Sequence, residues 1–267
     1  MSNARSLRPT PPILAALCCI GLGLAAPTAG ALMKSFSVTA NGTSAGATRS
    51  LELTSAVAMS GVKFYFQGGN DHKIERVGNW QTPGIMNYVF EDQDAGDKYV
   101  ARAGFRRLST NVIHEASRND CRGSCALPIH AETDKVFVLA GFELSNRRGE
   151  DRNIRQIAIL PELHKGRINV TFADNSGFDF LARVQYLLLP KSEVRTVETY
   201  TTTEKQRAVA AKSTADRVIQ GFNVRFTNGD HHVGDLTIWA SREITAYIKD
   251  KNDDDPMRGE VRVVVLR

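Results

Sequence analysis

The sequence predicts an all-β protein built from three tandem small antiparallel β-sandwich modules. The first observation is a repeat, because similar segments begin at Gly61, Gly141 and Gly221, at intervals of 80 residues. The second is that apolar and polar residues alternate along most of each copy, as in strands with one buried face. The third is that runs of Gly, Asn and Asp separate these stretches, as in hairpin turns.

Four strands are expected in each copy, and they recur in the same order. They span 61–66, 74–77, 86–92 and 99–105; then 141–146, 154–159, 168–174 and 180–186; then 221–226, 233–238, 244–250 and 257–263. About thirty residues precede each anchoring glycine and hold one or two weaker strands, with 136–139, 194–203 and 218–219 the clearest. Residues 203–216 are the one helix candidate, since they are rich in Ala, Lys, Glu and Gln. The predicted modules are 32–110, 111–190 and 191–267.

Composition and charge are those of an ordinary globular protein. Hydrophobic residues make up 42% and charged residues 24%, which excludes wholesale disorder, collagen and a coiled coil. Lys and Arg number 34 against 29 Asp and Glu, and the basic residues are spread along the chain. A nucleic-acid partner is therefore not expected.

The first 31 residues are expected to be a signal peptide. They contain no acidic residue, carry Arg5 and Arg8, and continue into an apolar run over 13–26 and a small-residue stretch ending at Ala31. The alternative is a membrane anchor, but the apolar run is shorter than the roughly 20 residues that span a bilayer. We expect cleavage near Ala31, no transmembrane segment in the mature chain, and a secreted, periplasmic or cell-surface location.

The predicted mature chain keeps two cysteines, Cys121 and Cys125. In an oxidising compartment an isolated pair is expected to form a disulfide, which would pin a local turn. A metal pair or a redox site are the alternatives. No second cysteine pair completes a zinc set, and the redox motif has two intervening residues rather than three.

An acidic residue followed by a basic one recurs after the second glycine of each copy. The candidate ligand-binding residues there are Asp71 and His72, Asp151 and Arg152, and Asp230 with His231 and His232. A carboxylate that accepts and a basic group that donates can hold sugar hydroxyls, although the same residues also make plain turns. Trp239 is a further candidate, as a stacking surface, together with Trp80, Tyr88 and Tyr247.

The hairpin after the third strong strand of each copy is acidic. Its candidate calcium ligands are Asp92, Asp94 and Asp97; Asp174 and Asp179; and Asp250, Asp253 and Asp255. Calcium takes 6–8 oxygen ligands, often from carboxylates, and none of these loops has the EF-hand pattern. The alternative is a solvated turn, because Asp, Asn and Gly are common turn formers.

Catalytic patterns are weak. Residues 42–46 match G-x-S-x-G, but that motif needs a buried strand before it and a helix after it, and here a strand-like stretch follows. Neither HExxH nor a Walker A motif is present, and no nucleophile-base-orienter set stands out. An enzyme is not expected.

The middle module combines a glycine-aliphatic strand entry, a strand with arginine, an Asn-Val-Thr strand and a last strand, over 138–142, 152–159, 168–172 and 182–186. This succession resembles the H-type lectins, the family of the snail agglutinins and the C-terminal domain of the discoidins. The resemblance implies six-stranded antiparallel sandwiches that assemble as trimers, so three modules in one chain would form a covalent pseudo-trimer. The family's Trp near the end of its last strand is absent, with Tyr186 nearest, and no sugar-binding residue carries over.

The sequence therefore favours an exported binding protein that recognises carbohydrate through three similar modules. Its expected partner is a glycan or a cell-surface polymer. The alternative is a structural protein of a cell surface or secreted complex that associates with itself. An exported hydrolase with an unrecognised site is the third hypothesis.

Overall fold

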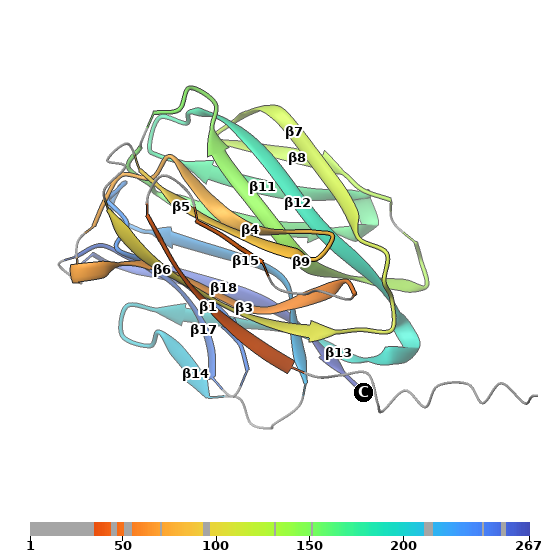
Figure 1. Ribbon diagram of the computed structural model, residues 1–267. Coiled ribbons are helices and arrows are strands. Elements are labelled where there is room, and N and C mark those ends of the chain that lie inside the picture. Colours follow the sequence, from red (N-terminus) through yellow and green to blue (C-terminus); the bar gives the residue numbers. More distant parts are fainter. Residues whose placement is uncertain are drawn as a thin grey trace, which may run out of the picture. The chain divides into compact units, whose positions relative to one another are not determined.

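The computed structural model describes residues 35–43, 47–50, 55–69, 71–92, 97–130, 132–150, 152–210, 216–241, 243–251 and 255–267. The predicted signal peptide lies outside the described residues. Described elements are strands and three short 3₁₀ turns, η2 (Gln67–Gly69), η3 (Leu163–Lys165) and η4 (Lys191–Glu193). The fold is an all-β sandwich, as predicted (Figure 1).

Each predicted module contains six of the described strands, and the modules 32–110, 111–190 and 191–267 are called segments 1, 2 and 3 below. Segment 1 holds β1 (Ser35–Thr43), β2 (Ala47–Ser50), β3 (Val57–Phe66), β4 (Arg76–Thr82), β5 (Ile85–Glu91) and β6 (Lys98–Arg107). Segment 2 holds β7 (His114–Arg122), β8 (Ser124–Pro128), β9 (Lys135–Asn146), β10 (Gln156–Glu162), β11 (Arg167–Ala173) and β12 (Asp179–Pro190). Segment 3 holds β13 (Val194–Thr203), β14 (Ala208–Ala210), β15 (Arg217–Phe226), β16 (Asp235–Ala240), β17 (Glu243–Lys249) and β18 (Met257–Leu266).

The helix expected over 203–216 is wrong where the chain is described. Ala208–Ala210 form β14, which pairs with β17 at the edge of a sheet. A good helix-forming composition without an apolar stripe gives little tertiary stabilisation, whereas a sheet edge offers backbone hydrogen bonds at once.

Each segment contributes its strands to two different sheets. Sheet A has the order β1-β6-β3-β16-β17-β14, sheet B β7-β12-β9-β4-β5-β2, and sheet C β13-β18-β15-β10-β11-β8. Sheets B and C are also joined by one residue pair, Arg122 with Ser124. Every sheet thus takes three strands from one segment and three from another. The strand pairing crosses every segment boundary. The division into three modules stays a prediction.

Within a segment, its two groups of three strands pack face to face. Phe64 of β3 stacks on Phe90 of β5 with ring centroids 5.4 Å apart, and Phe172 of β11 meets Phe180 of β12 edge-on at 5.9 Å. These rings belong to one continuous buried cluster that runs through all three segments. Apolar and polar residues therefore alternate in the sequence because successive side chains face this core and the outer surface of the sheet in turn.

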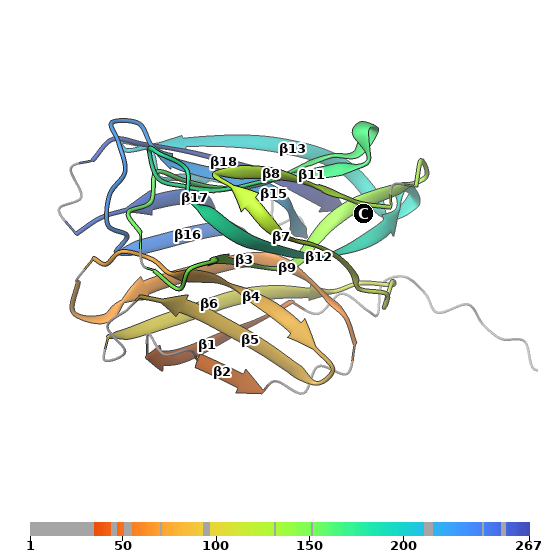
Figure 2. The same cartoon turned by 90° about the horizontal axis from the view of Figure 1, so that it is seen from above.

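Strands β3, β9 and β15 contact one another and lie near the middle of the molecule (Figures 1 and 2). Their early residues turn away from the sandwich core and form a second apolar cluster that includes Ala58, Val138 and Val218. These three residues occupy the same place in each segment, so the cluster lies where the segments converge. This second cluster joins the segments by apolar burial as well as by strand pairing.

In segments 2 and 3, the glycine that anchors the repeat is explained by the close approach of a strand from another segment. A Cβ atom at Gly221 would lie 2.5 Å from the carbonyl oxygen of Ile159, and one at Gly141 would lie 2.6 Å from that of Asn79. Both contacts are with the strand of the preceding segment. Only glycine lets that backbone approach so closely.

The predicted disulfide is present between Cys121 and Cys125, with an S–S distance of 2.00 Å and Cα atoms 5.2 Å apart. It links the end of β7 to β8 across a turn in which Gly123 has a positive φ of 61°. The crosslink is local, as its short loop implies.

Candidate functional site

The turns that follow the second glycine of each segment meet one another. Their bridged residues are His72 with Val233, Ile74 with Arg152, and Ile154 with His231. In each pair both backbone N–H groups donate to the partner's carbonyl oxygen, over 2.8 to 3.2 Å. Each segment therefore bridges to both others, and we call this closed arrangement the turn ring. Its three aliphatic residues are fully buried, which accounts for their recurrence in the sequence.

The repeated aspartates join one segment to the hairpin of another. An Oδ2 atom of Asp71 accepts the backbone N–H of Lys251 at 3.3 Å, and Asp230 accepts that of Asn175 at 3.2 Å. Asp151 lies outside the described residues. These two carboxylates hold turns together, and their predicted role in holding a ligand stays a prediction.

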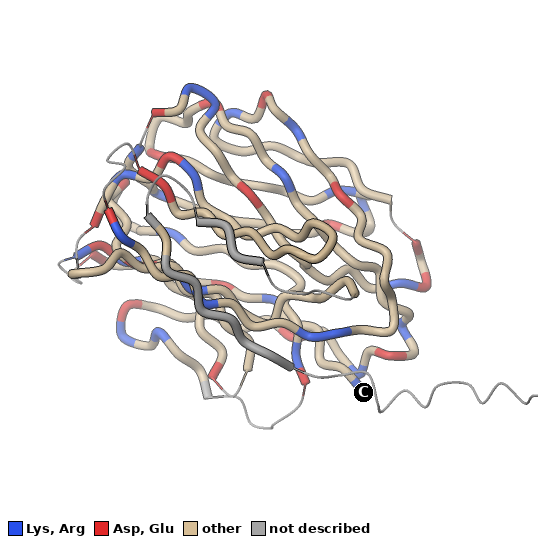
Figure 3. The backbone as a smooth tube through the Cα atoms, viewed as in Figure 1, with Lys and Arg blue, Asp and Glu red and all other residues tan. Residues whose placement is uncertain are grey.

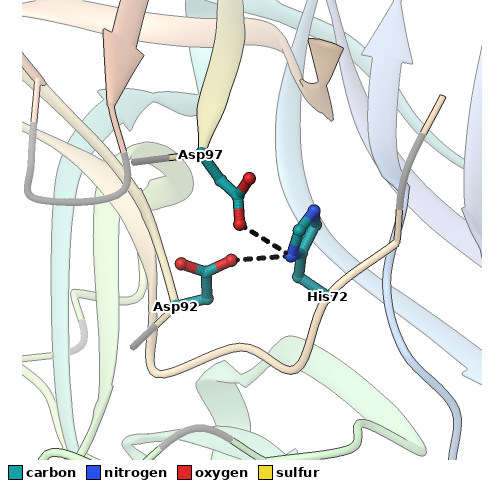
Figure 4. A group of neighbouring side chains, drawn as sticks. All are labelled: His72, Asp92 and Asp97. Carbon is teal, nitrogen blue, oxygen red and sulfur yellow. Dashed lines mark ion pairs between the residues drawn. The ribbon is translucent and has the colours of Figure 1, made fainter. Parts of the chain in front are cut away.

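His72 and the acidic hairpin of segment 1, predicted separately, lie together (Figure 4). The Nδ1 atom of His72 is 2.9 Å from an Oδ2 atom of Asp92 and 3.0 Å from Oδ2 of Asp97. The Asp92 side chain is 3% exposed, and the ring of Phe66 lies 4.3 Å from the imidazole. The hairpin ends place both carboxylates against one ring nitrogen.

Segment 3 repeats this cluster. The Nδ1 atom of His231 is 2.9 Å from Oδ2 of Asp255, and Asp250 belongs to the same group. A hydrogen bond with Asp250 holds the pKa of Asp255 below its usual range, with further help from Asn228 and His231. Phe226 packs on the imidazole at 4.7 Å, as Phe66 does in segment 1.

Segment 2 departs from this pattern. Arg152 stands in place of the histidine and pairs with Glu150. An Oδ1 atom of Asp174 accepts the backbone N–H groups of Ser176 and Gly177, at 2.8 and 2.6 Å, so it caps its own turn. Asp179 and Arg152 line the same polar pocket.

The two histidine clusters each offer three ligand atoms within 4.8 Å of one another, one nitrogen and two carboxylate oxygens. Such a set could hold a divalent ion with open positions for water, and imidazole suits zinc better than calcium. Asp94 and Asp253, two of the predicted calcium ligands, lie outside the described residues.

Trp239 lies in a groove of about 480 Å³ on the outer face of sheet A. Its six-membered ring covers Gly61 and Gly104. A Cβ atom added to Gly61 would lie 2.3 Å from Cε3 of Trp239, and one added to Gly104 would lie 3.3 Å from Cη2, so the ring packs directly on both glycines. The guanidinium of Arg102 sits over the indole, 5.4 Å from the ring centroid. Strands of segments 1 and 3 together form this floor.

A polar network borders the groove. Buried Asp235 accepts from the hydroxyls of Thr237 at 2.7 Å and Tyr247 at 3.1 Å, and its Oδ2 lies 3.1 Å from Nζ of Lys63. Burial lowers the pKa of Lys63, but the charge of Asp235 and the contact with Tyr247 outweigh it, so the net shift is upward. Burial also raises the pKa of Tyr247. The ammonium and the phenol are therefore held in their protonated forms.

The other predicted stacking residues differ from Trp239. Tyr88 is 1% exposed in the core, so its predicted role as a stacking surface is wrong, because its place in the strand pattern faces the sandwich interior. Trp80 occupies the same repeat position as Trp239 and is half-buried on sheet B. His232 is exposed and lies outside the histidine cluster.

Sequence analysis missed most residues of the groove, among them Lys63, Arg102 and Gly104. They come from segment 1, while Trp239 comes from segment 3. The alternation alone puts each of them on an outer face, but it gives no sign that β3 pairs with β16. The aligned positions of Trp80 and Trp239 were the available signal.

Within the described residues, no helix has the length and apolar character needed to cross a bilayer. The sequence matches no protein-family model, and no curated protein was found to be similar to it.

Proposed function

We propose that the chain is an exported binding protein that recognises carbohydrate through the Trp239 groove. The observation that carries the proposal is the indole resting on two glycines beside Lys63 and Asp235. A flat aromatic surface stacks on the apolar face of a sugar ring, while fixed donors and acceptors beside it bind hydroxyl groups. Export rests on the predicted signal peptide.

The resemblance to the H-type lectins stays a prediction. Six strands per segment and a ring of three segments are what that resemblance implies for a covalent pseudo-trimer. The binding groove, however, is proposed at one boundary rather than in three equal copies. Gly104 of sheet A is replaced at the same position by Gln185 in sheet B and Arg262 in sheet C.

The sequence predicts that the acidic hairpins bind calcium, and we widen this to a proposal that they bind a divalent cation. The two histidine clusters bind a divalent cation, and their nitrogen ligand favours zinc over calcium. Such an ion would stiffen the acidic hairpins of segments 1 and 3, which carry the two clusters.

A glycan array tests the function, with binding of the Trp239→Ala variant as the decisive comparison. We expect loss of the principal signal, because truncating a central aromatic anchor costs about 2 kcal/mol or more, roughly thirtyfold in affinity. Trp80→Ala, at the matched position of sheet B, should bind as the wild type does. An array without Trp239-dependent binding, together with concentration-dependent filaments in sedimentation, would instead favour the structural hypothesis.

A further inference from the structure

A second pocket, of about 470 Å³, opens where segment 2 meets segment 3, and none of the described residues that line it belongs to the Trp239 groove. Its wall is mostly apolar. Val136 and Leu188 lie on the paired strands β9 and β12 of segment 2, and Val197 lies on β13, at the edge of sheet C. Small-molecule sites are concave, mostly apolar and about 300–1,000 Å³ in volume. The pocket therefore has the size and the character of a site for a small molecule.

Most of this wall is held by the core, but Val197 is open. Phe137, which also lines the pocket, is stacked on Tyr186 with ring centroids 4.9 Å apart. Val136 and Leu188 are 8% and 7% exposed, whereas Val197 is 45% exposed. A molecule whose apolar part covers Val197 removes that surface from water, which favours binding.

Gln220 places a polar group in this wall. It is the extra residue of a bulge in β15, between Ile219 and Gly221, and a bulge turns a side chain away from its regular direction. The residue is 8% exposed, and its side-chain amide makes no hydrogen bond to another described residue. The same bulge carries Ser60 in β3 and Ala140 in β9, so only the copy beside this pocket has an amide. Buried side-chain amides are usually hydrogen-bonded, so this one offers a donor and an acceptor to a molecule in the pocket.

Two lysines line the pocket from adjoining positions. Lys135 pairs with Pro190 across β9 and β12, and Lys191 follows that proline. The backbone N–H of Lys191 also donates to the carbonyl oxygen of Asp134 at 3.0 Å, which holds the two lysines on one side.

The charge of these lysines is largely unmatched. Neither Lys135 nor Lys191 forms an ion pair with another described residue, and Glu132 is the one acidic residue among the described residues of the pocket. Elsewhere along the described chain, acidic and basic residues are interspersed (Figure 3). The pocket therefore combines an apolar wall with a local excess of positive charge, which suits an acid.

We infer that this pocket binds a small amphipathic acid, with its apolar body against the apolar wall and its carboxylate beside Lys135 and Lys191. Burial of the body supplies affinity, the two ammonium groups select the charge, and the amide of Gln220 adds a hydrogen bond that fixes the orientation. This activity lies beyond carbohydrate recognition and does not depend on the Trp239 groove.

The test titrates the ¹⁵N-labelled protein with three compounds that differ in their head group, 4-phenylbutanoate, 4-phenylbutanamide and 4-phenylbutylamine. The side-chain NH₂ resonances of Gln220 report on the site, and their absence in Gln220→Ala assigns them. Alanine occupies the same bulge at Ala140, so that variant should fold. We expect the acid to shift these resonances and to bind about tenfold more tightly than the amide, with the amine weakest. The preference should shrink from 50 to 500 mM NaCl.

Lysine variants test the selection of charge. Lys135→Gln combined with Lys191→Gln should lower the affinity for the acid to that for the amide. Lys205→Gln combined with Lys251→Gln, which removes the same charge at two exposed positions outside the pocket, should leave the preference unchanged. Equal affinity of the wild type for the acid and the amide would overturn the inference.

A valine variant tests the position of the site. Val197→Trp should fill the pocket and weaken binding of all three compounds, whereas Val112→Trp, at an exposed position outside the pocket, should not. No shift of the Gln220 resonances with any compound at millimolar concentration, or unchanged binding in Val197→Trp, would overturn the inference.

Two further measurements complete the test. A wild-type dimer in sedimentation equilibrium that Val197→Trp dissociates, without binding of any compound, would assign the pocket to a second copy of the chain and overturn the inference. Thermal melts of each variant establish that it is folded. Since the Trp239 groove shares no described residue with this pocket, glycan binding lost in Trp239→Ala tests the proposed function separately.

Discussion

His72 shows how one side chain changes the chemistry of a turn. The acidic hairpin of segment 1 could be read from the sequence as a set of oxygen ligands, but the histidine belongs to another turn, twenty residues earlier. Only the folded chain brings its Nδ1 atom within 3.0 Å of two carboxylates. An oxygen-only site thereby becomes a site with a nitrogen ligand.

We predict that a divalent ion raises the melting temperature through these two clusters. An ion that binds only the folded state, present at about 100 times its dissociation constant, adds about 2.7 kcal/mol. For a chain of this size that corresponds to roughly 5–10 °C. Melts in EDTA should therefore lie below melts in manganese, zinc or calcium, with magnesium for comparison.

Histidine variants locate the effect. The double variant His72→Ala and His231→Ala should lose most of the increase, whereas His232→Ala, an exposed neighbour outside the cluster, should keep it. Coincident melts with and without every ion would leave the hairpins as plain turns.

At the scale of strands, each sheet has one place where strands of two different segments lie side by side. At that place a polar pair of side chains joins the two strands, at the same position in every sheet. Sheet A has Lys63 with Asp235, at 3.1 Å. Sheet B has Glu143 with Arg76 at 3.5 Å, with the charges reversed, and sheet C has the uncharged pair Asn223 and Gln156 at 2.8 Å. A wrong pairing of segments would set like charges together or leave a charge facing an amide, so these pairs favour one order of segments.

We predict that Lys63→Gln lowers the free energy of unfolding by about 1 kcal/mol, because it leaves the buried carboxylate of Asp235 without its partly exposed cation. The pKa of Lys63 is raised above 10.5 in the folded protein. Its contribution is thus fully present below pH 10.5 and is lost as the pH rises through the folded pKa. Urea unfolding from pH 7 to 11 should show a smaller alkaline loss in Lys63→Gln than in the wild type.

Lys205→Gln, at an exposed position in a turn, is the control for that experiment. A wild-type and a Lys63→Gln curve that stay parallel up to pH 11 would contradict the prediction. Tyr247, whose pKa is also raised, contributes an alkaline loss of the same sign to both proteins.

Strand positions were predictable because each strand faces one core, which imposes a period of two residues. The expected strand over 194–203 coincides with β13, and that over 244–250 overlaps β17 by all but one residue. Pairing was not predictable in the same way. Strand β3 pairs with β6 of its own segment on one side and with β16 on the other. Alternation would be equally satisfied if another strand of its own segment took the place of β16, so the groove between segments could not be foreseen.

Over the whole molecule, the turn ring and the shared sheets make the order of segments cyclic. Segment 3 pairs with segment 1 through β16 and β3, just as segment 1 pairs with segment 2 through β4 and β9. We predict that a circular permutant beginning at residue 111, with residue 267 joined by a flexible linker to residue 35, keeps the fold. Its new ends lie in the exposed connection before β7, where Val112 is 61% exposed.

Circular dichroism should give a β-rich spectrum and a melting temperature within a few degrees of the wild type. A permutant opened between residues 139 and 140 is the control, because it cuts β9 at the place where the segments converge, and it should not fold. Aggregation of the first permutant under conditions that keep the wild type in solution would contradict the cyclic arrangement.

The contact between β16 and β3 closes the ring within a single chain, but nothing in its chemistry requires the two strands to come from the same chain. A molecule that opens there exposes a pairing edge on each side, and the same two edges on a second open molecule fit equally well. Closure and domain swapping are then in competition. The outcome depends on how the protein concentration compares with the effective concentration of one strand edge around the other in the same chain. For short tethers that effective concentration is near millimolar. Concentrated refolding should therefore yield exchanged dimers, and dilution should yield monomers.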